Sequence, residues 1–194
     1  MGLQSQLRLR NYLTITNMTN ILIIYSSTDG QTHKICQRLQ THIELHQEQH
    51  VTLVSIDKVS ELNLTQFDKI VIGASIRYGH HSPLVIAFIE KNKTLLDSKP
   101  NAFFSVSLVA RKPEKSTPEN NPYLKKFIKR IAWKPKELRV FAGNIDYPSY
   151  SFLDRSIIRL IMWITKGPTN PLTVVEYTDW HQVELFAQLI IDMK

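Results

Sequence analysis

The sequence is poor in cysteine and glycine and contains no long hydrophobic run. Its single cysteine, Cys36, excludes an internal disulfide and a multi-cysteine metal site, and it fits a reducing cytoplasm. No apolar stretch reaches the about 20 residues that a helix needs to cross a bilayer, so a membrane-spanning protein is not indicated. Internal repeats and low-complexity segments are missing as well. What remains is an ordinary globular composition, with 43% hydrophobic and 21% charged residues in a chain of 194.

Residues 1–19 are expected to form a disordered leader. Arg8 and Arg10 are not followed by a continuous apolar stretch, so this leader does not have the pattern of a secretory signal. Met18 lies directly before the first expected strand, and a translation start at that methionine is the alternative. Residues 20–194 have the length of one domain with a substantial core.

Positive charge is concentrated in one part of the chain. The net charge is +7, from 24 basic and 17 acidic residues. Residues 107–170 contain 13 basic and 5 acidic residues, so the rest of the chain is close to neutral. Such a local excess indicates an anionic partner, either a membrane surface, an acidic small molecule or nucleic acid, unless it serves only solubility.

Short β-rich runs alternate with helical patterns. The first run has apolar residues on both faces, which is typical of a central parallel strand covered by helices. We therefore predict an α/β fold: a five-stranded parallel sheet in the order 2-1-3-4-5, with helices on both faces and an insertion in the last strand. The expected strands are residues 21–25, 51–56, 69–74, 102–108 and 138–142, and the expected helices are 32–47, 83–96, 121–131 and 179–193.

The loop after the first expected strand has the features of a phosphate site. The N–H groups and dipole of a helix start favour an anion without a lysine, and Gly30 lets the chain turn tightly. The loop lacks the Gly-Lys-Ser/Thr ending of a P-loop and the three glycines of the dinucleotide fingerprint, so it suits a monophosphate. We expect Asp29 to point away from the ligand and either to cap the helix or to hold a neighbouring N–H group. The predicted cofactor contacts in this loop are Ser27, Thr28, Asp29, Gly30, Gln31 and Thr32.

Residues 23–32 match a known signature. In the flavodoxin pattern, two aliphatic residues and an aromatic residue are followed at fixed spacings by Ser/Thr, a small residue and Thr, and this segment resembles it at every constrained position. The resemblance implies a flavodoxin-like FMN-binding domain over residues 20–194. An ordinary Ser/Thr helix cap is the alternative interpretation of the same residues.

The loops after the third and fourth expected strands should hold the flavin ring, because ligands of such sheets bind at the carboxyl ends of the strands. Tyr78 is expected either to stack on the ring or to pack under its loop, and Arg77 could face an acidic substrate. The fourth loop has no aromatic residue, which would leave one face of the ring open to a bulky substrate. The predicted ring contacts are Ser75, Ile76, Arg77, Tyr78 and Gly79, together with Ser107, Leu108, Val109 and Ala110.

Three further runs resemble one enzyme family. Residues 71–80, 108–115 and 177–180 are similar to segments of the quinone-dependent protoporphyrinogen IX dehydrogenases, and the similarity extends from Ile21 to about Ile191. The resemblance implies bound FMN and oxidation of protoporphyrinogen IX to protoporphyrin IX in haem synthesis. It also implies that electrons pass to a membrane quinone, either menaquinone or ubiquinone.

The same resemblance suggests how side chains would serve such a substrate. Arg77, Arg111 and Lys112 are the candidates for holding its propionates. His80 and His81 are candidate proton acceptors, and the alternative is that both are exposed loop histidines without a catalytic role. Because the cofactor carries the redox chemistry, we assign no side chain as a certain catalytic residue.

The segment of about residues 146–173 is too long for a simple connection and resembles the insertion of long flavodoxins. As a helix, residues 152–166 place an apolar stripe opposite a basic side. This pattern indicates a helix that lies in a membrane interface or one that packs on the sheet. We expect peripheral attachment to the cytoplasmic face of the inner membrane. The predicted membrane contacts are Leu153, Arg155, Ile157, Arg159, Leu160, Ile161, Trp163 and Ile164.

Other patterns give no further partner. His42 and His46 lie one helical turn apart without a third ligand, so no metal is expected. The basic run 125–130 lacks interleaved exposed aromatic residues, so nucleic acid is not expected. Three other functions stay open: a flavodoxin-type electron carrier, which usually presents an acidic surface, a general NAD(P)H:quinone reductase, and a flavin-free membrane adapter.

Overall fold

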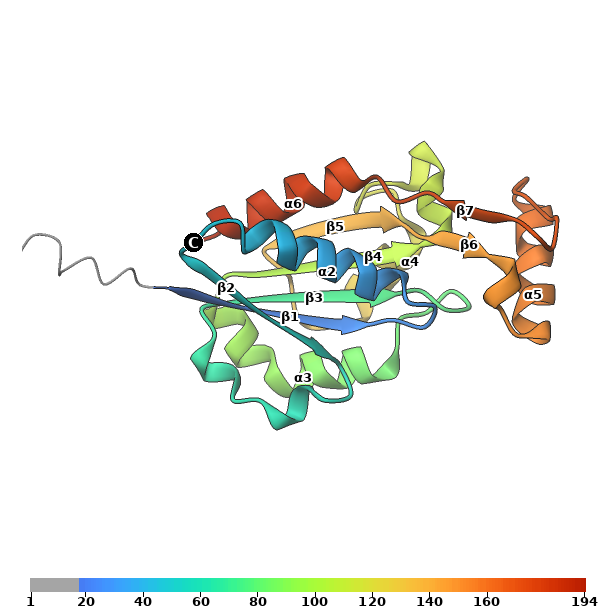
Figure 1. The fold of residues 1–194 in the computed structure, drawn as a ribbon. Coiled ribbons are helices and arrows are strands. Elements are labelled where there is room, and N and C mark those ends of the chain that lie inside the picture. The colour runs from blue at the N-terminus through green and yellow to red at the C-terminus, as the bar shows by residue number, and fades with distance from the viewer. Residues whose placement is uncertain (1–17) are drawn as a thin grey trace, which may run out of the picture.

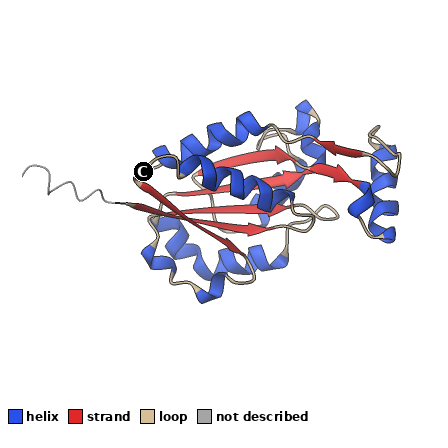
Figure 2. Cartoon of the chain, in the orientation of Figure 1, coloured by secondary structure: helices blue, strands red, loops and turns tan. Residues whose placement is uncertain are grey.

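The computed structural model describes residues 18–194 and contains one five-stranded sheet within them. Its strands are β1 (Thr19–Ser26), β2 (Gln49–Ser55), β3 (Lys69–Ser75), β4 (Asn101–Ser107) and β5 (Glu137–Ala142). They are paired in parallel in the order β2-β1-β3-β4-β5, which confirms the predicted topology (Figures 1 and 2). Most of the expected leader, residues 1–17, lies outside the described residues.

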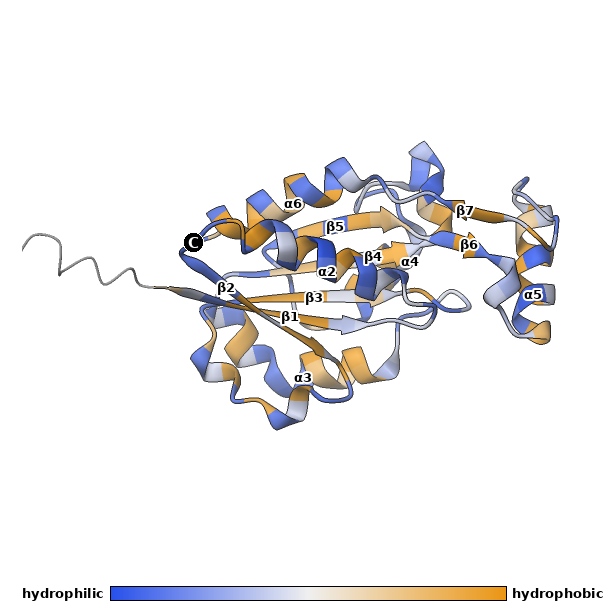
Figure 3. Cartoon of the chain, in the orientation of Figure 1, coloured by the Kyte–Doolittle hydropathy of each residue, from blue (hydrophilic) through white to orange (hydrophobic). Residues whose placement is uncertain are grey.

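Helices cover both faces of the sheet. One face packs against α2 (Gln31–Ile43) and α6 (Trp180–Asp192), and the other against α3 (Pro83–Ser98) and α4 (Pro122–Arg130). The central strands are hydrophobic along most of their length because both of their faces are buried (Figure 3). Two separate hydrophobic clusters, one on each face, hold the layers together.

Local signals explain where the helices begin and end. Asn121 caps α4 by accepting hydrogen bonds from the N–H groups of Tyr123 and Leu124, at 3.2 and 3.1 Å. Asp179 caps α6 by accepting a hydrogen bond from the N–H group of Gln182, at 3.2 Å. The expected helix over residues 32–47 is wrong at its end, since α2 stops at Ile43, its last buried residue. Residues 44–47 are exposed and have no apolar face that would hold a further helical turn.

The insertion extends the molecule beyond the carboxyl ends of the strands (Figure 1). Strands β6 (Asn144–Asp146) and β7 (Val174–Glu176) form a separate antiparallel pair, and α5 (Phe152–Ile164) lies between them in the chain. The insertion therefore follows β5 and does not interrupt its pairing in the main sheet. A third hydrophobic cluster belongs to it, made of Ile145, Tyr147, Tyr150, Ile158 and Met162.

Candidate functional site

A cavity of about 720 Å³ lies at the carboxyl ends of the strands. Its walls come from the loops after β1, β3 and β4, from the first turns of α4, and from α5. Cavities of this size hold small organic ligands. The position is the one predicted for the cofactor, because loops from neighbouring parallel strands meet at this edge.

The loop after β1 leads into α2 through a residue in the left-handed conformation. Gly30 is the N-cap residue and has a φ of 84°, in the left-handed region that favours glycine. The helix begins at Gln31, so the N–H groups of its first turn have no acceptor within the helix. These groups and the helix dipole make the loop suitable for an anion.

Buried hydroxyl groups complete this end of the cavity. The side-chain oxygens of Ser27, Thr32 and Ser107 are buried, and none of them has a hydrogen-bond partner within residues 18–194. All three residues line the cavity. Leaving a buried hydroxyl unpaired costs about 1–3 kcal/mol, so the arrangement fits a ligand that brings acceptor oxygens, such as a phosphate.

Only some of the other residues predicted as cofactor contacts in the β1 loop reach the cavity. Asp29 and Gln31 line the cavity, whereas Thr28 and Gly30 do not. The side-chain amide of Gln31 donates to Glu176 and Thr178, at 2.7 and 2.8 Å, and thereby ties the loop to the chain that leads into α6.

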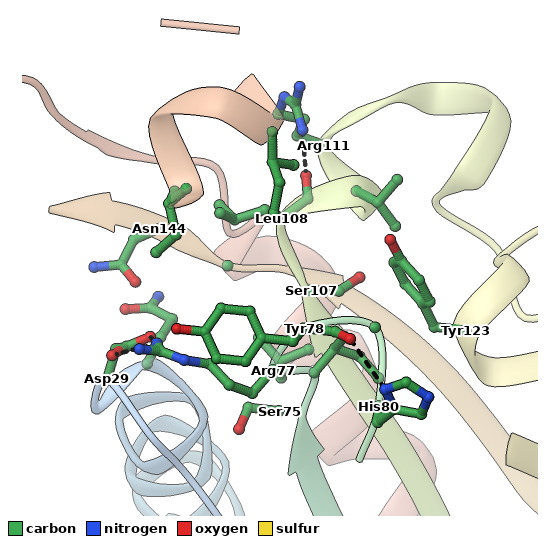
Figure 4. Close-up of a pocket in the computed structure, with 18 of the residues that line it drawn as sticks. Asp29, Ser75, Arg77, Tyr78, His80, Ser107, Leu108, Arg111, Tyr123 and Asn144 are labelled. Carbon is green, nitrogen blue, oxygen red and sulfur yellow. Dashed lines mark hydrogen bonds and ion pairs between the residues drawn. The ribbon is translucent and has the colours of Figure 1, made fainter. Parts of the chain in front are cut away.

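The predicted capping role of Asp29 is wrong. No side chain caps α2, and the Asp29 carboxylate instead accepts hydrogen bonds from Nη1 of Arg77, at 2.7 and 3.0 Å. Nη2 of Arg77 lies 2.6 Å from Oδ1 of Asp154 in α5. Arg77 therefore bridges the β1 loop and the insertion. Figure 4 shows its contact with Asp29. A charged guanidinium forms stronger hydrogen bonds with a carboxylate than a neutral backbone N–H group does, which favours Arg77 as the partner of Asp29.

This ion network changes the titration of its members. Partial burial lowers the pKa of Arg77, but the charges of Asp29 and Asp154 outweigh this effect and raise it overall. Hydrogen bonds from Tyr78 and Ser151, together with Arg77, lower the pKa of Asp154 to about 2. Asp154 is therefore ionised, and Arg77 is charged and paired, at any pH near neutrality.

Tyr78 and Gly79 form a tight turn. Arg77 and His80 exchange both backbone hydrogen bonds, at 2.9 and 3.0 Å, and the two residues between them have φ values of 49° and 81°. A two-residue turn with both φ values positive matches the twist of the flanking chain. The turn leaves Tyr78 about half exposed on the cavity wall, with its hydroxyl donating to Asp154. Tyr78 thus borders the ligand space and does not pack under its loop.

The β4 loop supplies most of its predicted contacts. Ser75, Ile76 and Gly79 from the β3 loop and Ser107, Leu108 and Val109 line the cavity, as does Arg111. Ala110 does not, because its side chain is buried in the cluster on the α3 face. Arg111 donates to the carbonyl of Leu108 and to both oxygens of Thr165, at 2.9 to 3.3 Å. Lys112 does not line the cavity.

The two candidate histidines have different environments. His80 is exposed on the cavity wall. His81 is buried, lies outside the cavity, and has Nε2 at 2.9 Å from Oγ of Ser105. Its ring packs against Phe103 and Phe127, and burial lowers its pKa to about 3. His81 is therefore neither an exposed loop residue nor a proton acceptor in the cavity, and both predictions are wrong for it.

Several lining residues were not predicted from the sequence. Tyr123 and Lys126 reach the cavity from α4, and Asn144, Tyr150, Ile158 and Met162 reach it from the insertion. The sequence contained a signal for Tyr123 and Lys126. A helix that follows β4 begins at the carboxyl edge of the sheet, and a helix start was expected near residue 121. Ile161, expected as a membrane contact, also lines the cavity.

Comparison with known proteins identifies related sequences and a related fold. A family model described as a flavodoxin domain matches residues 22–171. Protoporphyrinogen IX dehydrogenase (quinone) of Escherichia coli (strain K12) is 44% identical over 170 residues, which cover 87% of this chain and 93% of the relative. A relative of the same name from Leishmania major is 39% identical over 166 residues, covering 86% and 72%. The crystal structure of oxidised flavodoxin 1 from Bacillus cereus, 14% identical, shares the fold with a TM-score of 0.50 and covers 89% of this chain and 97% of that protein.

Proposed function

Because this chain belongs to the quinone-dependent protoporphyrinogen IX dehydrogenase family and carries a flavodoxin domain, we propose that it oxidises protoporphyrinogen IX to protoporphyrin IX, with FMN as cofactor and a quinone as electron acceptor. The observation that carries the proposal is the 44% identity to a dehydrogenase of that name over nearly the whole of both chains. Menaquinone or ubiquinone is the acceptor we propose.

The cavity has the features that FMN needs. Ser27 and Thr32 would hold the phosphate with their unpaired hydroxyls and with the N–H groups of the α2 start. The β3 loop and the β4 loop, with Tyr78 and Ser107, would flank the ring. When bound, FMN supplies the two-electron redox chemistry, which none of the cavity's side chains offers.

The remaining walls suit an apolar macrocycle with charged substituents. Ile158, Ile161 and Met162 of α5 and the rings of Tyr123 and Tyr150 provide mostly hydrophobic surface. Their task is to orient the substrate and to exclude water around the reacting carbon atoms. Arg111 lines the cavity wall and forms no ion pair within residues 18–194, since its hydrogen-bond partners there are oxygens of Leu108 and Thr165.

An anaerobic assay tests this function. Purified protein reconstituted with FMN is mixed with protoporphyrinogen IX and a quinone, and porphyrin fluorescence is followed. We expect a fluorescence increase that depends on both protein and quinone. No increase over the uncatalysed rate would contradict the proposal. Consumption of NAD(P)H with quinone, in the absence of porphyrinogen turnover, would instead identify a general quinone reductase, and a protein that stays colourless with FMN would indicate a flavin-free adapter.

We also propose that α5 attaches the enzyme to the cytoplasmic face of the inner membrane. Within residues 18–194 no helix is long and apolar enough to span a bilayer. Helix α5 does not pack on the sheet through the predicted apolar stripe. Its buried residues are Ile158 and Met162, which belong to the hydrophobic cluster of the insertion. The residues left exposed on α5 are Phe152, Leu153, Ile157, Leu160, Ile161, Trp163 and Ile164. An exposed apolar helix surface with neighbouring Arg155 and Arg159 fits the headgroup region of an anionic bilayer.

The location of this surface supports the same proposal. Helix α5 lies at the end of the molecule, beyond the carboxyl ends of the strands (Figure 1). It lines the cavity with Ile158, Ile161 and Met162, and its other large apolar residues are exposed. A lipid-soluble quinone would therefore reach the cavity directly from the bilayer.

Substitution of two exposed α5 residues tests membrane attachment. Ile157→Asp with Leu160→Asp should reduce flotation with phosphatidylglycerol-containing liposomes about tenfold. The double variant loses two apolar side chains that would enter the bilayer, and it brings two negative charges to an anionic surface. Neither residue lines the cavity, so FMN content should not change. Leu45→Asp with Leu84→Asp is a matched control, since both leucines are exposed elsewhere. Unchanged flotation of the α5 variant would refute attachment through this helix.

A further inference from the structure

The cations that line the cavity differ in how their charges are matched. Arg77 is paired with the carboxylates of Asp29 and Asp154, so this group of three is already net negative. Arg111 has its guanidinium committed to neighbouring backbone and hydroxyl oxygens. Lys126, from the second turn of α4, forms no ion pair within residues 18–194. An unmatched ammonium group at the wall of a cavity is available to an anionic ligand.

His80 holds the Lys126 ammonium in place. Nδ1 of His80 lies 3.0 Å from the carbonyl oxygen of Tyr78, which only accepts hydrogen bonds, so Nδ1 carries the proton. In the neutral ring Nε2 is then an acceptor, and Nζ of Lys126 donates to it at 3.2 Å. This bond uses one of the three ammonium protons and leaves the positive charge uncompensated.

The rest of α4 increases the positive potential at this position. Lys125, Lys129 and Arg130 accompany Lys126 in the helix, which contains no acidic residue. Like charges one turn apart destabilise a helix slightly. They also concentrate a field that attracts anions at the nearby cavity mouth.

The location of Lys126 is separate from the phosphate loop. The turn that carries His80 packs close to α4, since a Cβ on Gly79 would lie 3.4 Å from the Tyr123 ring. Figure 4 shows Tyr123 and His80 together on one side of the cavity and Asp29 on the other. The phosphate of FMN would use hydroxyl and N–H groups on the Asp29 side, so it does not require this lysine. The charge of this lysine is therefore available to a second anion.

We infer that Lys126, positioned by His80, is a carboxylate subsite that binds a propionate of the substrate. The inference rests on the proposed function and refines the sequence-based choice of Arg77, Arg111 and Lys112. The guanidinium of Arg111 already donates to oxygens of Leu108 and Thr165. Arg77 would have to give up two carboxylates to take that role, and Lys112 does not line the cavity.

Comparing the free acid of the substrate with its dimethyl ester tests the subsite. With wild type, KM for protoporphyrinogen IX should be lower than for the ester. Lys126→Ala should raise KM for the free acid about fivefold, with kcat changed less than twofold and KM for the ester unchanged, because only the acid has a charge to lose. Lys126→Arg should restore most of the preference. Lys134→Ala is the control, since Lys134 is exposed outside α4 and does not line the cavity.

Binding of the product gives a readout that does not require turnover. Lys126→Ala should weaken binding of protoporphyrin IX about fivefold in fluorescence anisotropy, whereas its dimethyl ester should bind both proteins equally. Flavin absorbance should show equal FMN content in all variants. Equal losses for acid and ester, or none for either, would overturn the subsite. Absence of turnover by wild type, with the acid-specific binding loss intact, would contradict the proposed function alone.

Discussion

Replacing Ser27 by alanine and Thr32 by valine together should weaken FMN binding at least about 100-fold without destabilising the apoprotein. A hydrogen bond to a charged group contributes roughly 1.5–3 kcal/mol, so two lost bonds remove about 3–6 kcal/mol of binding free energy. The free energy of unfolding of the apoprotein should rise, because both hydroxyls are buried without a partner within residues 18–194. Apolar side chains of similar shape remove that desolvation cost.

Two measurements separate these effects. Quenching of FMN fluorescence gives the Kd, and urea unfolding gives the free energy of unfolding of the apoprotein. Thr28→Val is a matched control, because Thr28 belongs to the same loop and does not line the cavity. Its Kd should stay within about threefold of wild type. An unaltered Kd in the double variant would show that these hydroxyls do not hold the phosphate.

Acidification from pH 7 to pH 5 should cost the folded protein about 2 kcal/mol through His81 alone. The pKa of His81 is lowered to about 3 by burial and then by the neighbouring His80, against an ordinary value of 6.5. Between these two values the unfolded chain binds a proton that the folded protein does not. Stability therefore falls as the pH drops below about 6.5, with a slope of about 1.4 kcal/mol per pH unit, and the loss is complete near pH 3.

A double variant isolates this contribution. His81→Phe with Ser105→Ala removes both hydrogen-bond partners and keeps a ring against Phe103 and Phe127. Urea unfolding at pH 7, 6 and 5 should show a smaller loss of stability on acidification than in wild type. His46→Gln, at an exposed position, serves as the control and should keep the wild-type slope. Equal slopes in the double variant and wild type would mean that His81 takes up its proton in the folded state.

The fold was predictable because its signals are local. The central strands β1 and β3 contain uninterrupted apolar runs, and the predicted strands agree with the observed ones to within about two residues at each end. The phosphate loop was predictable for the same reason, since Ser27, Gly30 and Thr32 lie within one strand-to-helix turn. Only the end of α2 was placed wrongly, where exposed polar residues continue a helical pattern without a face to bury.

The side-chain network was not predictable, because it joins residues far apart in the sequence. Asp29, Arg77 and Asp154 come from three elements, and the choice between a helix cap and an ion pair depends on their distances in the fold. The periodicity of α5 presented a similar ambiguity. Apolar residues surround much of this helix, so the pattern alone could not show that Ile158 and Met162 face inward while Ile157 and Leu160 stay exposed.

The separate hydrophobic cluster of the insertion has a consequence for how ligands enter. Its five buried residues are distinct from the two clusters that fasten the helices to the sheet. A segment with a small core of its own opens at a lower free energy than strands in the middle of a sheet. An α5 wall that opens while the phosphate loop stays folded would let a bulky macrocycle enter and leave without displacing the cofactor.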